Sequence, residues 1–297
     1  MKLTIFTPTY NRRDNLINLY NSILKQKISE DKKCDMEWLI VDDGSSDGTK
    51  EKINELINEN KIVIRYFYKE NGGKHTAHNF AVDHASGEYI MICDSDDILT
   101  QNAISLVCEA IEKTCSDKNI AGMVGYRNLQ TENGEKSNIQ CKFPHNVEYS
   151  KLNDLFKEEG VFDTVQIYKT SVLRKYKFPE SDGELFFPEN WCWRTIDKFY
   201  DIFVIQKVLE EGKYQEDGLS IGKGSSMTDP FRNPNAYADY SFLYYETSYK
   251  IIKKIWYYGK YKAFQKFGGK TNHKENIVLN AVSFPVQIYW RIKYMKK

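Results

Sequence analysis

The chain has 297 residues, enough for one large domain or for a domain with an appendage. Its 42 Lys and Arg residues nearly balance its 41 Asp and Glu residues, and a net charge of +1 gives no overall field that favours nucleic acid as a partner. No run of about 18 apolar residues suggests a membrane span. The N-terminus has no secretory leader, so we expect a cytoplasmic location.

Five short apolar runs predict strands, and residues at helical spacing between them predict helices. The runs are residues 2–7, 37–42, 62–68, 89–93 and 120–127. This α/β alternation predicts a mostly parallel sheet with right-handed crossovers. In such a sheet the loops at the carboxyl ends of the strands converge on one crevice, where ligands bind.

Three carboxylates directly follow the fourth predicted strand: Asp94, Asp96 and Asp97. Residues two apart on an extended chain share a face, so Asp94 and Asp96 would point the same way. Two hard oxygen donors side by side suit Mg²⁺ or Mn²⁺ and, through the metal, a phosphate. The alternative is that these aspartates only cap the next helix, which is the role we expect for Asp97.

The turn after the second predicted strand, residues 42–49, is also rich in carboxylates. These groups can accept hydrogen bonds from a nucleobase or a ribose, or the segment can be a plain turn that caps the following helix. The chain contains neither a G-x-G-x-x-G motif after the first strand nor a P-loop, which argues against a dinucleotide fold and a P-loop enzyme. Lys74, at a predicted helix start, is placed to contact a phosphate, unless it is an ordinary solvated lysine.

Four motifs occur in register along the first part of the chain: PTYNR at 8–12, VDDGSSDGT at 41–49, NGGKHTAHN at 71–79 and GEYIMICDSDD at 87–97. Together they closely resemble the family 2 glycosyltransferases, strongly over residues 1–130 and more weakly to about residue 220. The resemblance implies the GT-A fold, a Rossmann-like, mostly parallel sheet flanked by helices. It also implies inverting, metal-dependent transfer from a nucleoside-diphosphate sugar, with uridine diphosphate as the expected carrier. The expected acceptor is a saccharide or a lipid-linked saccharide in surface polysaccharide synthesis, with no nucleic acid involved.

The resemblance assigns roles to seven residues of these motifs. It places six residues around the nucleotide: Pro8, Tyr10, Asp42, Asp43, Lys74 and Asp94. Asp96 would hold Mn²⁺ or Mg²⁺ most directly, and Asp94 would contact the metal through water, or the ribose. Asp94 therefore belongs to both the expected metal site and the expected nucleotide site.

Inverting transfer also needs a carboxylate that takes the proton of the acceptor hydroxyl. Family members place an acid, often in a Glu-Asp pair, at a helix start after the irregular middle region. Glu189 fits this position, although the pair here is Glu-Asn, and the alternative is that Glu189 only favours the helix start through the helix dipole. Asp217 is the rival acid. On the acceptor side we expect Trp191, Arg194 and Asp217, with core packing as the alternative for at least one of Trp191 and Trp193.

We expect a catalytic domain over residues 1–220, made of a nucleotide-binding half, 1–127, and an acceptor half, 128–220. A loop and a helical, aromatic-rich extension should follow over residues 221–297.

The last 22 residues, 276–297, mix apolar side chains with Arg and Lys, and Pro285 would kink a helix there. One interpretation of this pattern is a peripheral contact with the anionic inner face of the cell membrane. The alternatives are packing onto the catalytic domain and contact with a second subunit of a homo-oligomer.

Two other functions compete with glycosyl transfer. A nucleotidyltransferase of sugar phosphates would need a Gly-rich, Arg-containing loop after the first strand, and residues 7–10 contain no glycine. A non-catalytic sugar-binding relative would be free to lose its acids, whereas Asp94, Asp96 and Glu189 are all present.

Overall fold

The computed structural model describes residues 2–26, 35–130, 143, 146–155, 164–213, 228–268, 273–274 and 276–295. The chain divides into two compact units. The sheet unit comprises Met1–Lys177 and Phe199–Glu216, and the helical unit comprises Phe178–Lys198 and Asp217–Lys297. The segment Phe178–Lys198, which we expected in the acceptor half, therefore groups with the C-terminal helices, and the expected boundary at residue 220 lies outside the described residues.

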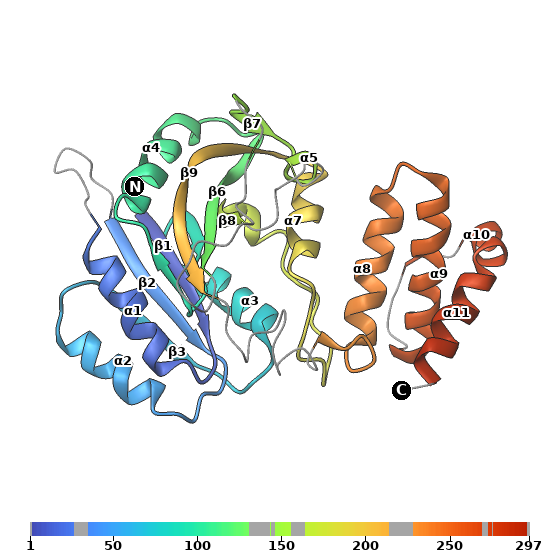
Figure 1. The fold of residues 1–297 in the computed structure, drawn as a ribbon, viewed down its shortest axis with the longest axis horizontal. Helices are drawn as coiled ribbons and strands as arrows, with labels where there is room; N and C mark the ends of the chain where they lie inside the picture. The colour runs from blue at the N-terminus through green and yellow to red at the C-terminus, as the bar shows by residue number, and fades with distance from the viewer. Residues whose placement is uncertain are drawn as a thin grey trace. The chain divides into compact units, whose positions relative to one another are not determined.

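The first four strands of the sheet unit are parallel, as the sequence predicts. They are β1 (Lys2–Thr9), β2 (Asp35–Asp42), β3 (Ile64–Tyr68) and β4 (Tyr89–Ile92). They lie in the order β3-β2-β1-β4 and are connected by helices α1 (Arg13–Leu24), α2 (Thr49–Asn58) and α3 (Lys74–His84) (Figure 1). The order reverses at β1, so the chain has a topological switch point between β1 and β4, where ligands of open α/β sheets bind.

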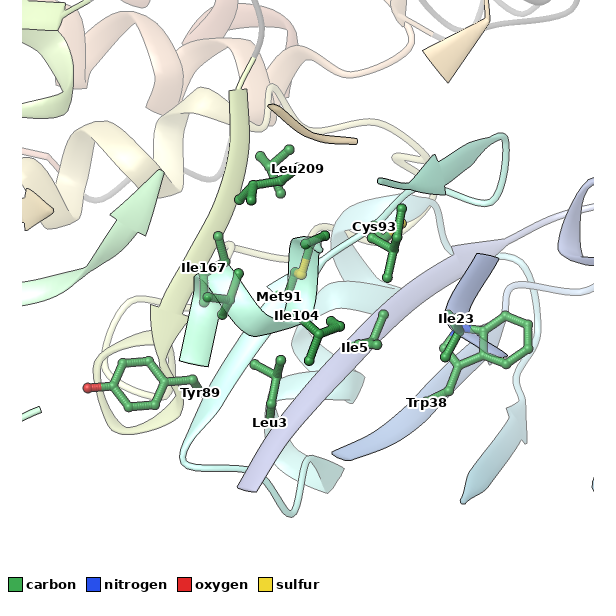
Figure 2. Packing of buried hydrophobic residues seen from close by; sticks show 14 of the residues in the cluster. Leu3, Ile5, Ile23, Trp38, Tyr89, Met91, Cys93, Ile104, Ile167 and Leu209 are labelled. Carbon is green, nitrogen blue, oxygen red and sulfur yellow. The ribbon is translucent and has the colours of Figure 1, made fainter. Parts of the chain in front are cut away.

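Side-chain alternation along β1 explains why helices cover both faces of this sheet. Leu3 and Ile5 point into one core cluster with Trp38, and α1, α2 and α4 (Ala103–Thr114) complete that cluster (Figure 2). Phe6 points to the other face, where its ring lies 5.9 Å from that of His78 on α3. The helices on both faces keep the parallel strands buried.

The later strands make the sheet mixed rather than continuing the parallel pattern. β8 (Thr164–Lys169) runs antiparallel to both β4 and β6 (Ile120–Gln130), and β6 runs parallel to β9 (Asp201–Lys213). β5 (Asp97–Leu99) and β7 (Tyr149–Ser150) pair antiparallel with β9. The strand expected at 120–127 is present, but β8 separates it from β4. Short helices α5 (Leu152–Leu155) and α6 (Thr170–Leu173) flank β8 in the chain.

The helical unit confirms the expected aromatic-rich helical extension. Its helices are α7 (Asn190–Asp197), α8 (Pro234–Thr247), α9 (Ile251–Gly268), α10 (Ile277–Val282) and α11 (Phe284–Met295). Tyr258, Tyr261 and Phe264 of α9 form its core with Ala238. Pro285 lies in the first turn of α11, where a missing N–H does no harm. Helix α10 therefore ends at Ser283 and a new helix begins, instead of one helix being kinked at the proline. Within the described part of the chain, no helix combines the length and apolar character needed to cross a bilayer.

Candidate active site

The predicted site residues of the sheet unit meet at the carboxyl edge of the parallel strands. Thr9 of β1 is paired with Asp42 of β2, and Asp42 with Tyr68 of β3. On the other side of β1, Cys93 continues the β4 ladder, because its N–H donates to the Phe6 carbonyl at 2.9 Å. The segments that follow these strands therefore emerge together, as the sequence predicts.

Asp94, Asp96 and Asp97 lie close together in the loop after β4. One carboxylate oxygen from each lies within 4.8 Å of those of the others. The Asp97 N–H donates to the Asp94 carbonyl at 3.1 Å, so the chain turns at once and brings the third carboxylate back beside the first. This arrangement offers three hard oxygen ligands from four consecutive residues, which suits a divalent cation.

The expected role of Asp97 as a helix cap is wrong. Asp97 begins β5, where it is paired with Gly212 of β9, whereas α4 starts six residues later with Asn102 at its N-cap. Only 2% of Asp97 is exposed, and its Oδ1 accepts a hydrogen bond of 2.6 Å from the Arg127 guanidinium. A buried ion pair with a distant strand replaces the local cap, and a local pattern carries no information about that partner.

Arg127, Gly212 and Glu210 complete this cluster, and no motif in the sequence pointed to them. A Cβ atom on Gly212 would lie 2.3 Å from Asp97 Oδ1 and 3.0 Å from the Arg127 guanidinium, so a glycine is needed here for the ion pair to form. Glu210 of β9 is only 2% exposed. The one signal in the sequence was the charged side chain of Arg127 at the end of the strand predicted at 120–127.

The electrostatics of the cluster fit a bound cation. Burial would raise the pKa of Asp94, but Lys74 and then Arg127 lower it below its ordinary value. Burial and the neighbouring Asp94 raise the pKa of Asp96. Burial likewise raises the pKa of Asp97, and Arg127 offsets this only in part. Carboxylates crowded in this way repel one another, and a divalent cation would relieve that repulsion.

Lys74 lies beside the cluster, at the first residue of α3. Its Nζ is 2.7 Å from Asp94 Oδ1 and 2.9 Å from Asp94 Oδ2. Gly73, with φ of 90°, adopts a backbone conformation that favours glycine and turns the chain into the helix. The ammonium group of Lys74 therefore lies at a helix N-terminus, where both this group and the helix dipole attract an anion.

Asp42 and Asp43 are held by the protein itself. Asp42 accepts hydrogen bonds from the Tyr66 hydroxyl at 2.6 Å and the Ser45 N–H at 2.8 Å. Asp43 accepts from Lys69 Nζ at 2.6 Å and from the N–H groups of Gly72 and Gly73. These bonds fix the loop that leads into α3 and so place Lys74.

Of the remaining residues expected around the nucleotide, Pro8 lies near the end of β1 and Tyr10 directly follows that strand. Pro8 is buried, whereas 43% of Tyr10 is exposed. An exposed aromatic ring at the carboxyl end of a strand is suited to pack against a flat ligand.

The expected acceptor residues belong to the helical unit. Glu189 is exposed and occupies the N-cap position of α7, but its carboxylate accepts no capping hydrogen bond from the helix start. Arg194 lies 4.1 Å from the centre of the Tyr244 ring and donates to the Thr247 hydroxyl at 2.6 Å, so it connects α7 to α8. Asp217 lies outside the described residues.

The two tryptophans of α7 both contact other aromatic rings. Trp193 is 6% exposed, and its ring is 6.4 Å from that of Phe178. The partly buried Trp191 lies 5.4 Å from the ring of Phe187. Core packing therefore accounts for Trp193, while Trp191 keeps part of its surface accessible.

Comparison with known proteins finds relatives that are named as glycosyltransferases. The chain is 34% identical over 116 residues to an uncharacterized glycosyltransferase of Mycoplasma genitalium, which covers 38% of each chain. It is 27% identical over 225 residues to a GalNAc(5)-diNAcBac-PP-undecaprenol beta-1,3-glucosyltransferase of Campylobacter jejuni, covering 74% of this chain and 68% of that one. The chain thus matches well under half the length of the first of these relatives.

Solved structures and a family model agree with these relatives. The Staphylococcus aureus TarS fragment 1-349, in complex with UDP-GlcNAc, superposes with a TM-score of 0.61 at 19% identity, covering 96% of this chain and 79% of that one. The fold is therefore the GT-A fold. The model of glycosyl transferase family 2 matches residues 4–177, more than half of the chain and the part that carries the acidic cluster. The chain belongs to glycosyl transferase family 2.

Proposed function

We propose that this protein transfers a sugar from a nucleoside-diphosphate sugar to a saccharide or lipid-linked saccharide acceptor in surface polysaccharide synthesis. The observation that carries the proposal is the acidic cluster of Asp94, Asp96 and Asp97 at the end of β4, beside Lys74. The UDP-GlcNAc bound to the TarS fragment supports a uridine diphosphate carrier. The family match favours glycosyl transfer over nucleotidyl transfer.

We assign the donor to the carboxyl edge of the parallel strands. Asp96, assisted by Asp94, would hold Mn²⁺ or Mg²⁺, and such an ion neutralises charge on a departing diphosphate. Lys74 adds a positive charge at the N-terminus of α3. Pro8, Tyr10 and the 42–43 carboxylates would line the nucleoside pocket.

Transfer with inversion is a single displacement. The bond from the acceptor oxygen to the anomeric carbon forms as the bond from that carbon to the diphosphate oxygen breaks, and the electron pair leaves with the diphosphate. The hydroxyl proton goes to a carboxylate, which we assign to Glu189 because it is exposed at the start of α7. Trp191 and Arg194 on the same helix are the proposed acceptor-side neighbours.

The donor assignment is tested by Asp96→Ala. We expect calorimetry to show that Mn²⁺-dependent binding of uridine diphosphate is lost, while the fold is retained because Asp96 is partly exposed. The matched control is Asp83→Ala, which removes a half-exposed aspartate from the last turn of α3 and should leave binding unchanged. Equal affinity in Asp96→Ala and in the parent protein would refute the metal assignment.

The base assignment is tested separately by Glu189→Gln. This variant should bind the donor normally but lose sugar transfer by roughly 100-fold or more, the usual contribution of a positioned base. Near-normal turnover would show that another acid is the base, and Asp217 would then be the next residue to substitute.

A further inference from the structure

Helix α11 exposes a row of apolar side chains and buries a polar one. Phe284, Ile288 and Ile292 recur every four residues and are 53%, 40% and 48% exposed. In contrast, Gln287 is only 3% exposed, and its amide donates to the Asn280 carbonyl at 3.0 Å. A surface helix of a water-soluble unit normally shows the opposite arrangement.

The exposed apolar side chains continue onto the two preceding helices. Val278 on α10 is 71% exposed, and Ile252 and Trp256, one turn apart on α9, are 78% and 41% exposed. The Trp256 ring lies 5.8 Å from the ring of Tyr289 on α11, which joins the two helices. We call the exposed side chains of these three helices the apolar stripe: Ile252, Trp256, Val278, Phe284, Ile288 and Ile292.

Close packing of the helices makes this stripe a fixed surface. A Cβ atom on Gly259 of α9 would lie 2.7 Å from Val286 Cβ on α11, so the glycine allows α11 to approach closely. On the inner side, the Trp290 ring lies 5.8 Å from that of Phe264. The three helices lie side by side in the last part of the chain (Figure 1).

The segment that carries the stripe is strongly basic. Residues 249–297 contain twelve Lys and Arg residues and a single acidic residue, Glu275, in a chain whose net charge is only +1. Lys253 and Lys293 are exposed on α9 and α11 themselves. A second copy of this face would meet it with the same positive charge, so charge opposes self-association here and favours an anionic partner.

We propose that the apolar stripe docks on an anionic lipid bilayer, with its isoleucine, valine, phenylalanine and tryptophan side chains at the acyl boundary and the lysines at the headgroups. Apolar side chains backed by many lysines are the features that hold a helix in the plane of an interface. This surface is wider than the tail 276–297, because it includes α9. It does not rest on the proposed transfer reaction, since binding needs neither donor nor acceptor.

Sedimentation of the full chain with vesicles tests the proposal without measuring enzyme activity. We expect binding to vesicles of phosphatidylcholine with phosphatidylglycerol, weak binding to phosphatidylcholine alone, and weaker binding at about 0.5 M salt than at about 0.1 M. The triple variant Val278→Ser, Ile288→Ser, Ile292→Ser should reduce the partition coefficient at least tenfold. All three residues are exposed, so the variant should keep the parent circular dichroism spectrum.

The matched control is Val63→Ser with Phe199→Ser, two exposed apolar residues of the sheet unit, and this variant should bind as the parent does. A separate variant, Lys253→Glu with Lys293→Glu, should lose its preference for anionic vesicles. Equal binding of the triple variant and the parent would overturn the proposal. So would sedimentation equilibrium showing a dimer of the parent that the triple variant lacks, because the stripe would then be a subunit contact.

Discussion

Glu37→Gln tests whether a buried carboxylate fixes the amino edge of the sheet. Glu37 is fully buried on β2. One of its oxygens, Oε1, accepts from the Thr4 hydroxyl at 2.6 Å and from the Ser86 N–H at 2.8 Å, and the other, Oε2, accepts from Arg65 at 3.2 Å. These bonds connect β1, β2, β3 and the segment before β4.

The loss of stability follows from the donors that surround this carboxylate. A glutamine has one acceptor oxygen, so its amide group would face either Arg65 or the pair of Thr4 and Ser86. One charge-assisted hydrogen bond would be lost, about 1.5–3 kcal/mol, and a buried donor would be left without an acceptor, about 1–3 kcal/mol. We therefore expect Glu37→Gln to lower the free energy of unfolding by about 2.5–6 kcal/mol at neutral pH.

The pH dependence gives a second measurement of the same group. Burial alone would raise the pKa of Glu37, but hydrogen bonds from Ser86 and Thr4 bring it below its ordinary value. Its stabilisation should therefore be fully present above the ordinary glutamate pKa and disappear as the pH falls through the lower, folded-state pKa. The variant should lack this acid-dependent loss.

Urea unfolding followed by circular dichroism measures both effects. Glu55→Gln is the control, because Glu55 is 66% exposed in an ion pair with Lys52 and should contribute about 0.5 kcal/mol or less. If Glu37→Gln lost no more stability than Glu55→Gln, or kept the acid dependence of the parent, the reasoning would be refuted.

Two further variants test the buried cluster and the helical unit. Arg127→Met should lower the free energy of unfolding in urea by about 2–4 kcal/mol, because it leaves the Asp97 carboxylate buried without its cation. Adding Asp97→Asn should restore most of this stability. No recovery in the double variant would contradict the assignment of the ion pair. Glu184→Ala should lower stability by about 1–2 kcal/mol, because its carboxylate accepts the Asn235 and Ala236 N–H groups at the start of α8, at 2.8 and 2.9 Å. An unchanged thermal midpoint would argue against that cap.

The sequence predicted the first half of the sheet well because its signals are local. Each apolar run ends in a polar turn, and parallel strands with helical crossovers bring all their carboxyl ends to one edge. This is why the sequence alone predicted that Asp94, Asp96 and Lys74 lie at the same edge of the sheet. The order of the four motifs also predicted the family, and the family model confirms that prediction over residues 4–177.

By itself, then, the sequence determined the parallel strands, the carboxylates at their ends and the helical character of the C-terminal part. The tertiary structure decided what depends on partners distant in the chain. It placed β8 between β4 and β6, paired Asp97 with Arg127 instead of leaving it as a helix cap, and left a row of apolar side chains on α11 exposed. Hydrophobic periodicity shows that a residue lies on an apolar face, but only packing decides whether that face is covered.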